Sequence, residues 1–380
     1  MTRTCDIFCA VVDNYGDIGV CWRLARQLST ELGQSVRLWV DDLASFHRLC
    51  DRVDPALETQ RVDSVEVRHW ASLLPAVRQA DIVIEGFGVR LPDHYVAAMV
   101  ERKPRPVWIN LEHLSAEQWV DGCHGLPSPH PSLPLVKHFF FPGFTKATGG
   151  LLIERGLAQA REAFRSDADA VARFWHALDI APGEDAAVRV SLFCYDNAAL
   201  PALVAAWSSA TVPVVCIVPA GAALARLSAI AGHGIEPGAR VVRNNLTIAA
   251  IPFLDVEQYD RLLWACDMNF VRGEDSFVRA QLAARPLIWQ AYVQEDGAHM
   301  AKQAAFLDRY VEGMDEPTAA VMRSIHQAWN RQSPEMGQCW QALMARRIPA
   351  AAHARDWADR LVQGGNLAIK LAEFCRNQLE

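Results

Sequence analysis

The chain has 380 residues, of which 51% are hydrophobic and 21% are charged, and its formal net charge is −7 with a pI of about 6.0. This balance is globular and excludes a disordered chain, and the acidic net charge argues against general nucleic-acid binding, which requires a basic surface. Because single hydrophobic cores rarely grow past about 250–300 residues, two domains are expected.

The ten cysteines are scattered, without a CxxC pair. This spacing argues against a zinc or redox motif, and free thiols in a reducing cytoplasm are expected. No signal peptide is expected, because Asp6 interrupts the first apolar segment. The most apolar region, near 212–227, contains Pro213, Pro219 and Gly221, so no membrane-spanning segment is expected either.

In the first half, apolar runs alternate with amphipathic stretches. Strands are expected at 7–12, 36–40, 65–69, 80–85 and 106–111, and helices at 18–32 and 43–49. A proline-rich loop at 127–134 and an aromatic cluster packed around a loop at 139–144 follow, and then a long helix at 158–178. Strand and helix alternation of this kind predicts a parallel sheet covered on both faces.

The alternation restarts after the turn signal Pro182–Gly183. Strands are expected at 187–194, 212–218, 246–254, 268–271 and 286–290, and helices at 198–208, 222–231, 256–265 and 277–284. The sequence therefore predicts two consecutive open α/β domains, 1–178 and 179–349. Such sheets bind ligands outside the carboxyl ends of their strands, and two facing sheets would form a deep cleft between them.

Polar residues gather at three predicted strand ends, first in VVDNYGDIGVCW. Asp13, Tyr15, Gly16 and Asp17 stand between a strand and a helix. Glycine allows close approach of the backbone, and the start of a helix offers free N–H groups. The carboxylates are therefore candidates for chemistry at a pocket, although a helix cap at Asp17 and a turn closed by Asp13 would explain them as well.

The second group is NFVRGEDSFVRAQLA. Arg272 and Gly273 end a short strand, and Glu274, Asp275 and Ser276 open a helix. An arginine and a helix N-terminus together favour a phosphate, and the acids would then accept hydrogen bonds from sugar hydroxyls. The simpler interpretation is a Ser or Asp N-cap with a surface Arg–Glu pair.

The third group is SLFCYDN, in which Phe193 and Tyr195 lie two residues apart and share a face of the strand. Ordinary core alternation explains this spacing equally well. Two weaker signals are the glycines of IEGFGVRLP and the pair Glu112 and His113 in NLEHLSAEQW, which is a candidate lining of the cleft. In the second of these, Ser115 and Gln118 have the spacing of a capping box.

These blocks, with FFFPGFTKATGGLL, resemble the bacterial elongation factor P arginine rhamnosyltransferase family, EarP, in order and from near the start of the chain past QEDGAH. The resemblance implies a GT-B fold, with two Rossmann-like domains facing across a cleft and a last helix at about 350–380 that crosses back to the first domain. It implies inverting transfer of L-rhamnose from dTDP-β-L-rhamnose to an arginine of translation elongation factor P, with neither metal nor other cofactor. The second domain would hold the nucleotide sugar and the first would receive the protein acceptor.

The resemblance also implies site residues. The activity-critical carboxylates would be Asp13, Asp17 and Glu274. Because an arginine must lose a proton as the new bond forms, we expect one of the two acids of the first turn to act as base, and Asp17, at the helix start, is our choice. The residues implied to bind the donor are Tyr15, Gly16, Phe193, Tyr195, Phe253, Gln258, Arg272, Gly273, Glu274, Asp275 and Ser276. No role is assigned to Cys21, Cys123 or Gly86.

Two other functions fit the same features. One is a GT-B glycosyltransferase or epimerase that uses a different sugar nucleotide on a small acceptor. The other is a non-catalytic protein that binds elongation factor P and holds a nucleotide sugar only as a ligand.

Overall fold

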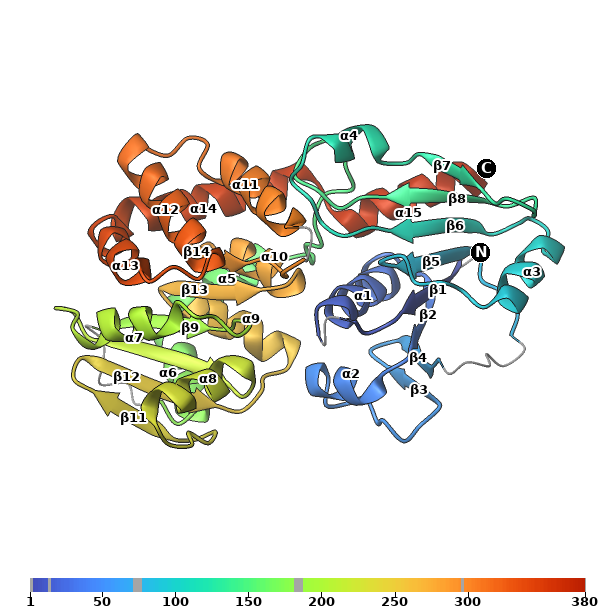
Figure 1. Ribbon diagram of the computed structural model, residues 1–380. Coiled ribbons are helices and arrows are strands. Elements are labelled where there is room, and N and C mark those ends of the chain that lie inside the picture. Colours follow the sequence, from blue (N-terminus) through green and yellow to red (C-terminus); the bar gives the residue numbers. More distant parts are fainter. Residues whose placement is uncertain (1–2, 13–14, 71–76, 181–186, 295–296, 380) are drawn as a thin grey trace. The chain divides into compact units, whose positions relative to one another are not determined.

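The computed structural model describes residues 3–12, 15–70, 77–180, 187–294 and 297–379. The chain divides into two compact units (Figure 1). Unit 1 comprises Met1–Arg155 and Leu361–Glu380, and unit 2 comprises Gly156–Arg360. Across the described residues, no helix combines the length and the apolar character that crossing a membrane requires.

Unit 1 is built on a mostly parallel sheet with the strand order β3-β4-β2-β1-β5-β6-β8-β7 (Figure 1). Its strands are β1 (Thr4–Cys9), β2 (Ser35–Val40), β3 (Thr59–Val62), β4 (Val65–His69), β5 (Ile82–Gly86), β6 (Val107–Leu111), β7 (Pro127–Pro129) and β8 (Val136–Phe140). Its helices are α1 (Gly16–Arg26), continued by the π-helical turn η1 (Gln27–Glu31), then α2 (Leu43–Leu49), α3 (Asp93–Glu101), α4 (Trp119–Cys123) and α15 (Leu367–Leu379). The order reverses at β1, which pairs with β2 on one side and β5 on the other. The carboxyl end of β1 is therefore where a ligand is expected in this class of sheet.

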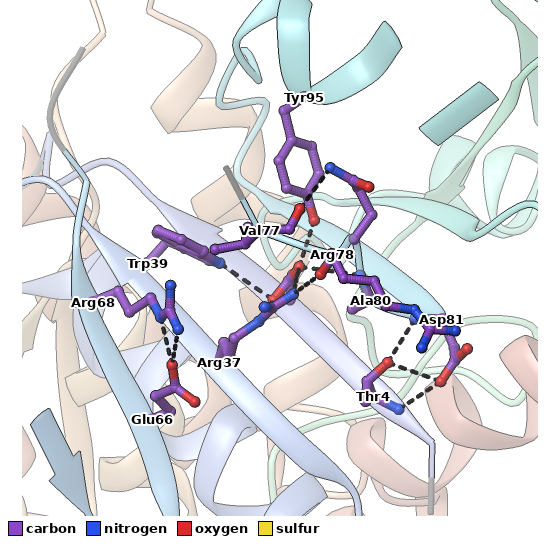
Figure 2. A network of polar contacts seen from close by, with 12 residues as sticks. Thr4, Arg37, Trp39, Glu66, Arg68, Val77, Arg78, Ala80, Asp81 and Tyr95 are labelled. Atoms are coloured by element: carbon purple, nitrogen blue, oxygen red, sulfur yellow. Dashed lines mark hydrogen bonds and ion pairs between the residues drawn. The ribbon is translucent and has the colours of Figure 1, made fainter. Parts of the chain in front are cut away.

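A fully buried carboxylate, Asp6, ties β1 to its neighbours in unit 1. It accepts hydrogen bonds from Arg37 Nε at 2.5 Å, from Arg37 Nη2 at 2.6 Å, from Trp39 Nε1 at 3.2 Å and from the Tyr95 hydroxyl. Figure 2 shows these donors converging, together with a separate ion pair between Arg68 and Glu66. A buried charge is tolerated only when it is paired and hydrogen-bonded, so this network ties β2 and α3 to β1.

Unit 2 is built on a second mostly parallel sheet, with the order β11-β12-β10-β9-β13-β14. Its strands are β9 (Val188–Leu192), β10 (Val214–Pro219), β11 (Arg240–Arg243), β12 (Leu246–Ile251), β13 (Met268–Arg272) and β14 (Leu287–Gln290). Its helices are α5 (Leu157–Ser166), α6 (Ala168–Ala177), α7 (Leu200–Ser208), α8 (Ala222–Ala231), α9 (Val256–Ala265), α10 (Asp275–Leu282), α11 (Ala298–Tyr310), α12 (Glu316–Asn330), α13 (Met336–Ala345) and most of α14 (Arg347–Gly364). Here the order reverses at β9, between β10 and β13.

The segment expected as one helix at 158–178 forms two helices of unit 2. Asp167 interrupts it and caps α6 by accepting a hydrogen bond from the N–H of Ala170 at 2.9 Å. Arg161 Nη1 donates to the carbonyl of Leu282 at 2.6 Å, and Phe174 and Trp175 are buried in the core around β10 and β12. The unit boundary consequently lies at 155/156, whereas the sequence favoured one after 178.

The last helix, α15, belongs to unit 1. The ring of Phe374 lies 5.3 Å from that of His138 and 5.8 Å from that of Phe140, both on β8. Lys370 Nζ donates to the carbonyl of Thr148 at 2.8 Å. Apolar and polar contacts together therefore attach the C-terminus to the sheet of the first unit.

Several strands differ from the sequence expectation. The stretch expected as an aromatic cluster around a loop, 139–144, begins within strand β8, which was not predicted, and the antiparallel edge strands β3, β7 and β11 were not predicted either. These edge strands are three or four residues long and largely exposed, so they lack a hydrophobic pattern. Strand β1 ends at Cys9 rather than at residue 12, because the N–H of Val11 bonds to Asp41 Oδ1 at 2.9 Å while Val12, 81% exposed, turns away.

Candidate active site

At the carboxyl edge of the sheet in unit 2, the guanidinium of Arg272 lies over two aromatic rings. Its guanidinium carbon lies 4.7 Å from the centre of the Phe193 ring and 4.2 Å from that of Tyr195. Phe193 and Tyr195 follow β9, and Arg272 ends the adjacent strand β13, so the strand reversal brings the three together. Arg272 is 9% exposed, so its side chain is buried rather than on the surface. Stacking fixes the plane of the guanidinium.

The turn after β13 is held by its own backbone and by Ser276. The Ser276 hydroxyl donates to the carbonyl of Arg272 and accepts from the N–H of Arg272 at 3.3 Å. Gly273 has φ +62°, a conformation that favours glycine, and its carbonyl accepts from Trp289 Nε1 at 2.9 Å. Glu274 occupies the N-cap position of α10 without a side-chain cap bond, so neither Ser nor Asp caps this helix. The first N–H groups of α10 follow Arg272 directly, as an anion site requires.

Further aromatic rings surround Arg272, and sequence reasoning missed two of them. The Tyr259 ring lies 5.7 Å from Phe193, and its hydroxyl has a raised pKa because of burial and of the negative charge of Asp275. The Tyr292 ring lies 5.6 Å from Tyr195, whose N–H bonds to Gln290 Oε1 at 2.9 Å. Two signals in the sequence could have found them: Tyr259 adjoins Gln258 in the motif, and Tyr292 follows the last strand.

The two looser candidates of the donor site lie farther along the same edge. Phe253 is half-buried just after β12, and Gln258 is exposed in the first turn of α9. Strands β10 and β9 lie between β12 and β13, so this part of the edge lies three strands from Arg272. That position suits a different portion of an elongated ligand.

In unit 1 the equivalent edge carries a carboxylate. Asp17 is the second residue of α1, 6% exposed, and its Oδ2 accepts a hydrogen bond from the N–H of Val12 at 3.0 Å. The N-cap position belongs to Tyr15, so the alternative of Asp17 as a helix cap is wrong. The Tyr15 hydroxyl accepts from Arg48 Nη1 at 3.1 Å. Asp13 lies outside the described residues.

Strands β1 and β5 and helix α1 pack too tightly to leave room for a side chain at Gly86. A Cβ there would lie 2.8 Å from Cys21 Sγ and 3.0 Å from the carbonyl oxygen of Phe8. The pKa of the Cys9 thiol is raised by its hydrogen bond with Cys21, then by burial, and also by the charge of Asp17. Gly86 therefore lets β5 and α1 approach β1, a structural role that the sequence did not reveal.

The two weaker candidates from the sequence, the glycines of IEGFGVRLP and the pair Glu112 and His113, lie at the ends of β5 and β6. The ring of Phe87 stacks on the imidazole of His113, with 4.5 Å between the centres and 17° between the planes. Phe87 has φ +60°, a conformation that costs a non-glycine residue about 1–3 kcal/mol. Asn110 Nδ2 donates to Glu112 Oε1 at 2.5 Å.

The capping box expected at Ser115 is wrong. Helix α4 begins at Trp119, and its cap position is Gln118. Ser115 instead forms a bridge to Gly143, and its hydroxyl donates to Glu117 Oε2 at 2.9 Å. A local turn and a tertiary contact therefore take the place of the predicted cap.

The sequence profile described as "Elongation-Factor P (EF-P) rhamnosyltransferase EarP" matches residues 5–376. The chain belongs to the EarP family. A protein-arginine rhamnosyltransferase of Pseudomonas putida is 47% identical to it over 100% of both chains. A solved structure described as "Structural basis for EarP-mediated arginine glycosylation of translation elongation factor EF-P" is 34% identical, with a TM-score of 0.71 over 99% of both chains.

The fold of this EarP-family chain is the GT-B type. The structure of MurG from Acinetobacter baumannii, 14% identical, matches with a TM-score of 0.50 over 99% of this chain and 100% of that chain. Each unit is accordingly a Rossmann-like domain, and the chain is a glycosyltransferase. Within its described residues, no group of three or more His, Cys, Asp or Glu side chains is placed to hold a metal ion.

The two edges of this EarP-family enzyme differ in what they can do chemically. Arg272 and the N–H groups opening α10 can neutralise an anionic group. A carboxylate such as Asp17 can pair with a cation or accept a proton. Phe193 and Tyr195 are half-buried beside the strand ends, so they are not simply core residues and can also contact a ligand.

Proposed function

We propose that this chain transfers L-rhamnose from dTDP-β-L-rhamnose to a guanidinium nitrogen of an arginine in translation elongation factor P, with inversion at the anomeric carbon. Membership of the EarP family supports the sugar and the acceptor. The observation that carries the proposal is Arg272, which lies over the rings of Phe193 and Tyr195 at the edge where α/β sheets of this kind bind nucleotides.

On the donor side, the leaving dTDP gains negative charge as the bond between the anomeric carbon and its phosphate oxygen breaks. In our proposal Arg272 and the N–H groups after Gly273 stabilise that charge. Glu274 and Asp275, which open the same helix, accept hydrogen bonds from sugar hydroxyls. Phe253 and Gln258, three strands away, contact the thymine end. Ser276 supports the turn through the backbone of Arg272.

On the acceptor side, the difficulty is that a guanidinium stays protonated and has no free lone pair. In our proposal Asp17 accepts an N–H proton while the new bond from nitrogen to the anomeric carbon forms. Asp13 holds the guanidinium through paired hydrogen bonds, and Tyr15 and Gly16 border the donor from the same turn. Attack from the face opposite the diphosphate inverts the configuration.

No resident cofactor or metal takes part in this proposal, and the positive charge at the diphosphate comes from the protein. The acceptor is a translation factor, so we place the reaction in the cytoplasm.

The test is incubation of the purified chain with elongation factor P and dTDP-β-L-rhamnose, followed by mass spectrometry. We expect a gain of one deoxyhexose on one arginine, with dTDP-glucose as the control donor. Nuclear magnetic resonance of the product should show an α-linked rhamnose. Transfer only to small molecules would favour the broader glycosyltransferase, and tight binding without transfer would favour a binding protein.

A further inference from the structure

Phe87 occupies a backbone conformation that is unusual for an aromatic residue. Among the described residues, the other non-glycine positions with positive φ are small or polar: Asp63, Ser64, Asp179, Asn244, Ala284 and Gln332. A large side chain retained in a strained conformation is most often found at a functional site. The proposed transfer reaction gives Phe87 no role.

The conformation of Phe87 is held by two contacts from the neighbouring strand β6. Its N–H donates to the carbonyl of Leu111 at 2.7 Å, and the N–H of Gly88 donates to Asn110 Oδ1 at 3.1 Å. Asn110 also donates to Glu112, so one side chain connects the turn to a carboxylate. The ring of Phe87 is thereby presented in a fixed orientation against His113.

This group lies at the same sheet edge as Asp17. Strand β5, which ends just before Phe87, pairs directly with β1, and Phe8 is in register with Glu85. His113 and Gly88 are exposed, and Phe87 and Glu112 are half-buried. A flat aromatic surface beside a carboxylate suits a planar cation, because the guanidinium of an arginine stacks on rings and pairs with carboxylates.

We propose that Phe87, His113 and Glu112 form an acceptor subsite that binds a basic loop of the protein acceptor next to the arginine that is modified. The inference rests on the proposed function for the identity of the acceptor. Two carboxylates at this edge, Glu112 and Asp17, and the net charge of −7 favour a basic segment as the occupant. The subsite determines affinity for the acceptor and takes no part in bond making.

The decisive variant is Phe87→Gly, because glycine removes the ring and tolerates the backbone conformation. We expect the KM and the Kd for elongation factor P to rise about tenfold or more, as is usual for the loss of a buried aromatic anchor at an interface. The value of kcat at saturating acceptor should change less than about threefold, because the subsite does not touch the reacting atoms. Affinity for dTDP and the melting temperature should not fall.

Two further variants separate stacking from fold effects. His113→Phe keeps a flat ring and should leave the KM within about threefold of the parent, whereas His113→Ala should raise it. Asn244→Gly is the matched control, since it also places glycine at a positive φ but lies in the β11–β12 hairpin of unit 2. It should change neither KM nor Kd.

The outcomes distinguish this inference from the function on which it rests. If the parent chain transfers rhamnose while Phe87→Gly keeps the parental KM and Kd, the subsite is wrong and the proposed function stands. If the parent binds the factor more tightly than Phe87→Gly but transfers nothing, the subsite stands and the proposed function fails. If the parent does not bind the factor at all, both are overturned. A lower kcat with an unchanged KM would also contradict the subsite.

Discussion

Around the point where their strand order reverses, the two sheets have the same arrangement of strands but present opposite charges at the carboxyl edge. In unit 1 that edge carries the carboxylate of Asp17, from the turn after the first strand. In unit 2 it carries the guanidinium of Arg272, the last residue of β13, which lies over two rings beside β9. The same fold thus supports either a base or an anion site.

The comparison teaches that topology determines where a ligand binds, whereas the turn residues determine its charge. Both edges are built by a strand that enters a helix, and both use a buried ionic side chain near the helix start. If this interpretation is right, substitutions at the edge of unit 1 should affect the transfer reaction, whereas substitutions at the edge of unit 2 should affect binding of the donor. Substitutions beneath the edges should affect the stability of one unit only.

The largest expected effect is on catalysis, from Asp17→Asn. Loss of a general base typically slows a reaction by about 10²–10⁴-fold, and we expect transfer to be nearly abolished. Asparagine still accepts the N–H of Val12, so the turn should remain. Mass spectrometry measures the transfer, and calorimetry should give an unchanged affinity for dTDP-rhamnose. An equal loss of donor affinity would remove the distinction between the two edges.

The next effect is on the stability of unit 1, from Asp6→Asn. An amide supplies only one acceptor atom and leaves the charge of Arg37 uncompensated, which typically costs about 3–5 kcal/mol at a buried pair. Denaturant unfolding measures the loss, and hydrogen exchange should localise it to unit 1. Glu66→Gln is the matched control, because its pair with Arg68 is partly exposed and worth less than about 1 kcal/mol. Similar losses in both variants would mean that burial is not the deciding factor.

A comparable effect in unit 2 depends on pH. Burial lowers the pKa of His326 from 6.5 to about 4, and one of its ring nitrogens, Nδ1, contacts the carbonyl of Met322 at 2.9 Å. Between pH 4 and pH 6.5, the imidazole of His326 is therefore protonated in the unfolded chain but neutral in the folded chain. The stability contribution is full above pH 6.5 and is lost as the pH falls toward 4, by roughly 3 kcal/mol.

Hydrogen exchange of unit 2 between pH 7 and pH 4 checks this expectation. His326→Gln should remove most of the slope, because glutamine does not titrate in this range. A slope that persists unchanged in His326→Gln would assign the acid sensitivity to other groups. Unit 1 offers a comparison in His124, half-buried, whose pKa is also lowered by burial.

The smallest expected effect is on donor affinity, from Arg272→Ala. Removing a charge-assisted contact to a diphosphate typically costs about 1.5–3 kcal/mol, or roughly 10- to 100-fold in Kd for dTDP. Arg272→Lys should recover only part of the affinity, since an ammonium keeps the charge but loses the stacked plane. Calorimetry measures both. Unchanged dTDP binding in Arg272→Ala would refute the phosphate assignment at this edge.

Much of the architecture could be predicted from hydrophobic periodicity. Apart from β8, the parallel strands of both sheets were expected close to where they lie, since buried runs bounded by turns leave a clear pattern. The short edge strands and the helix break at Asp167 could not be predicted, because neither an exposed edge strand nor a single helix cap produces a hydrophobic periodicity in the sequence. The placement of α5 in unit 2 depends on side-chain contacts with distant carbonyls, and that of α6 depends on the burial of Phe174 and Trp175.

The sequence by itself determined the class of fold, the family and the turns that carry Asp17, Arg272 and Glu274, because a motif is a local string of residues. Only the tertiary structure decided that Phe193 and Tyr195 stack on Arg272, that Gly86 makes room for Cys21, and that Phe87 meets His113. These contacts join residues that are between 26 and 79 positions apart along the chain. Register between neighbouring strands brings them together, and register is a property of the folded sheet.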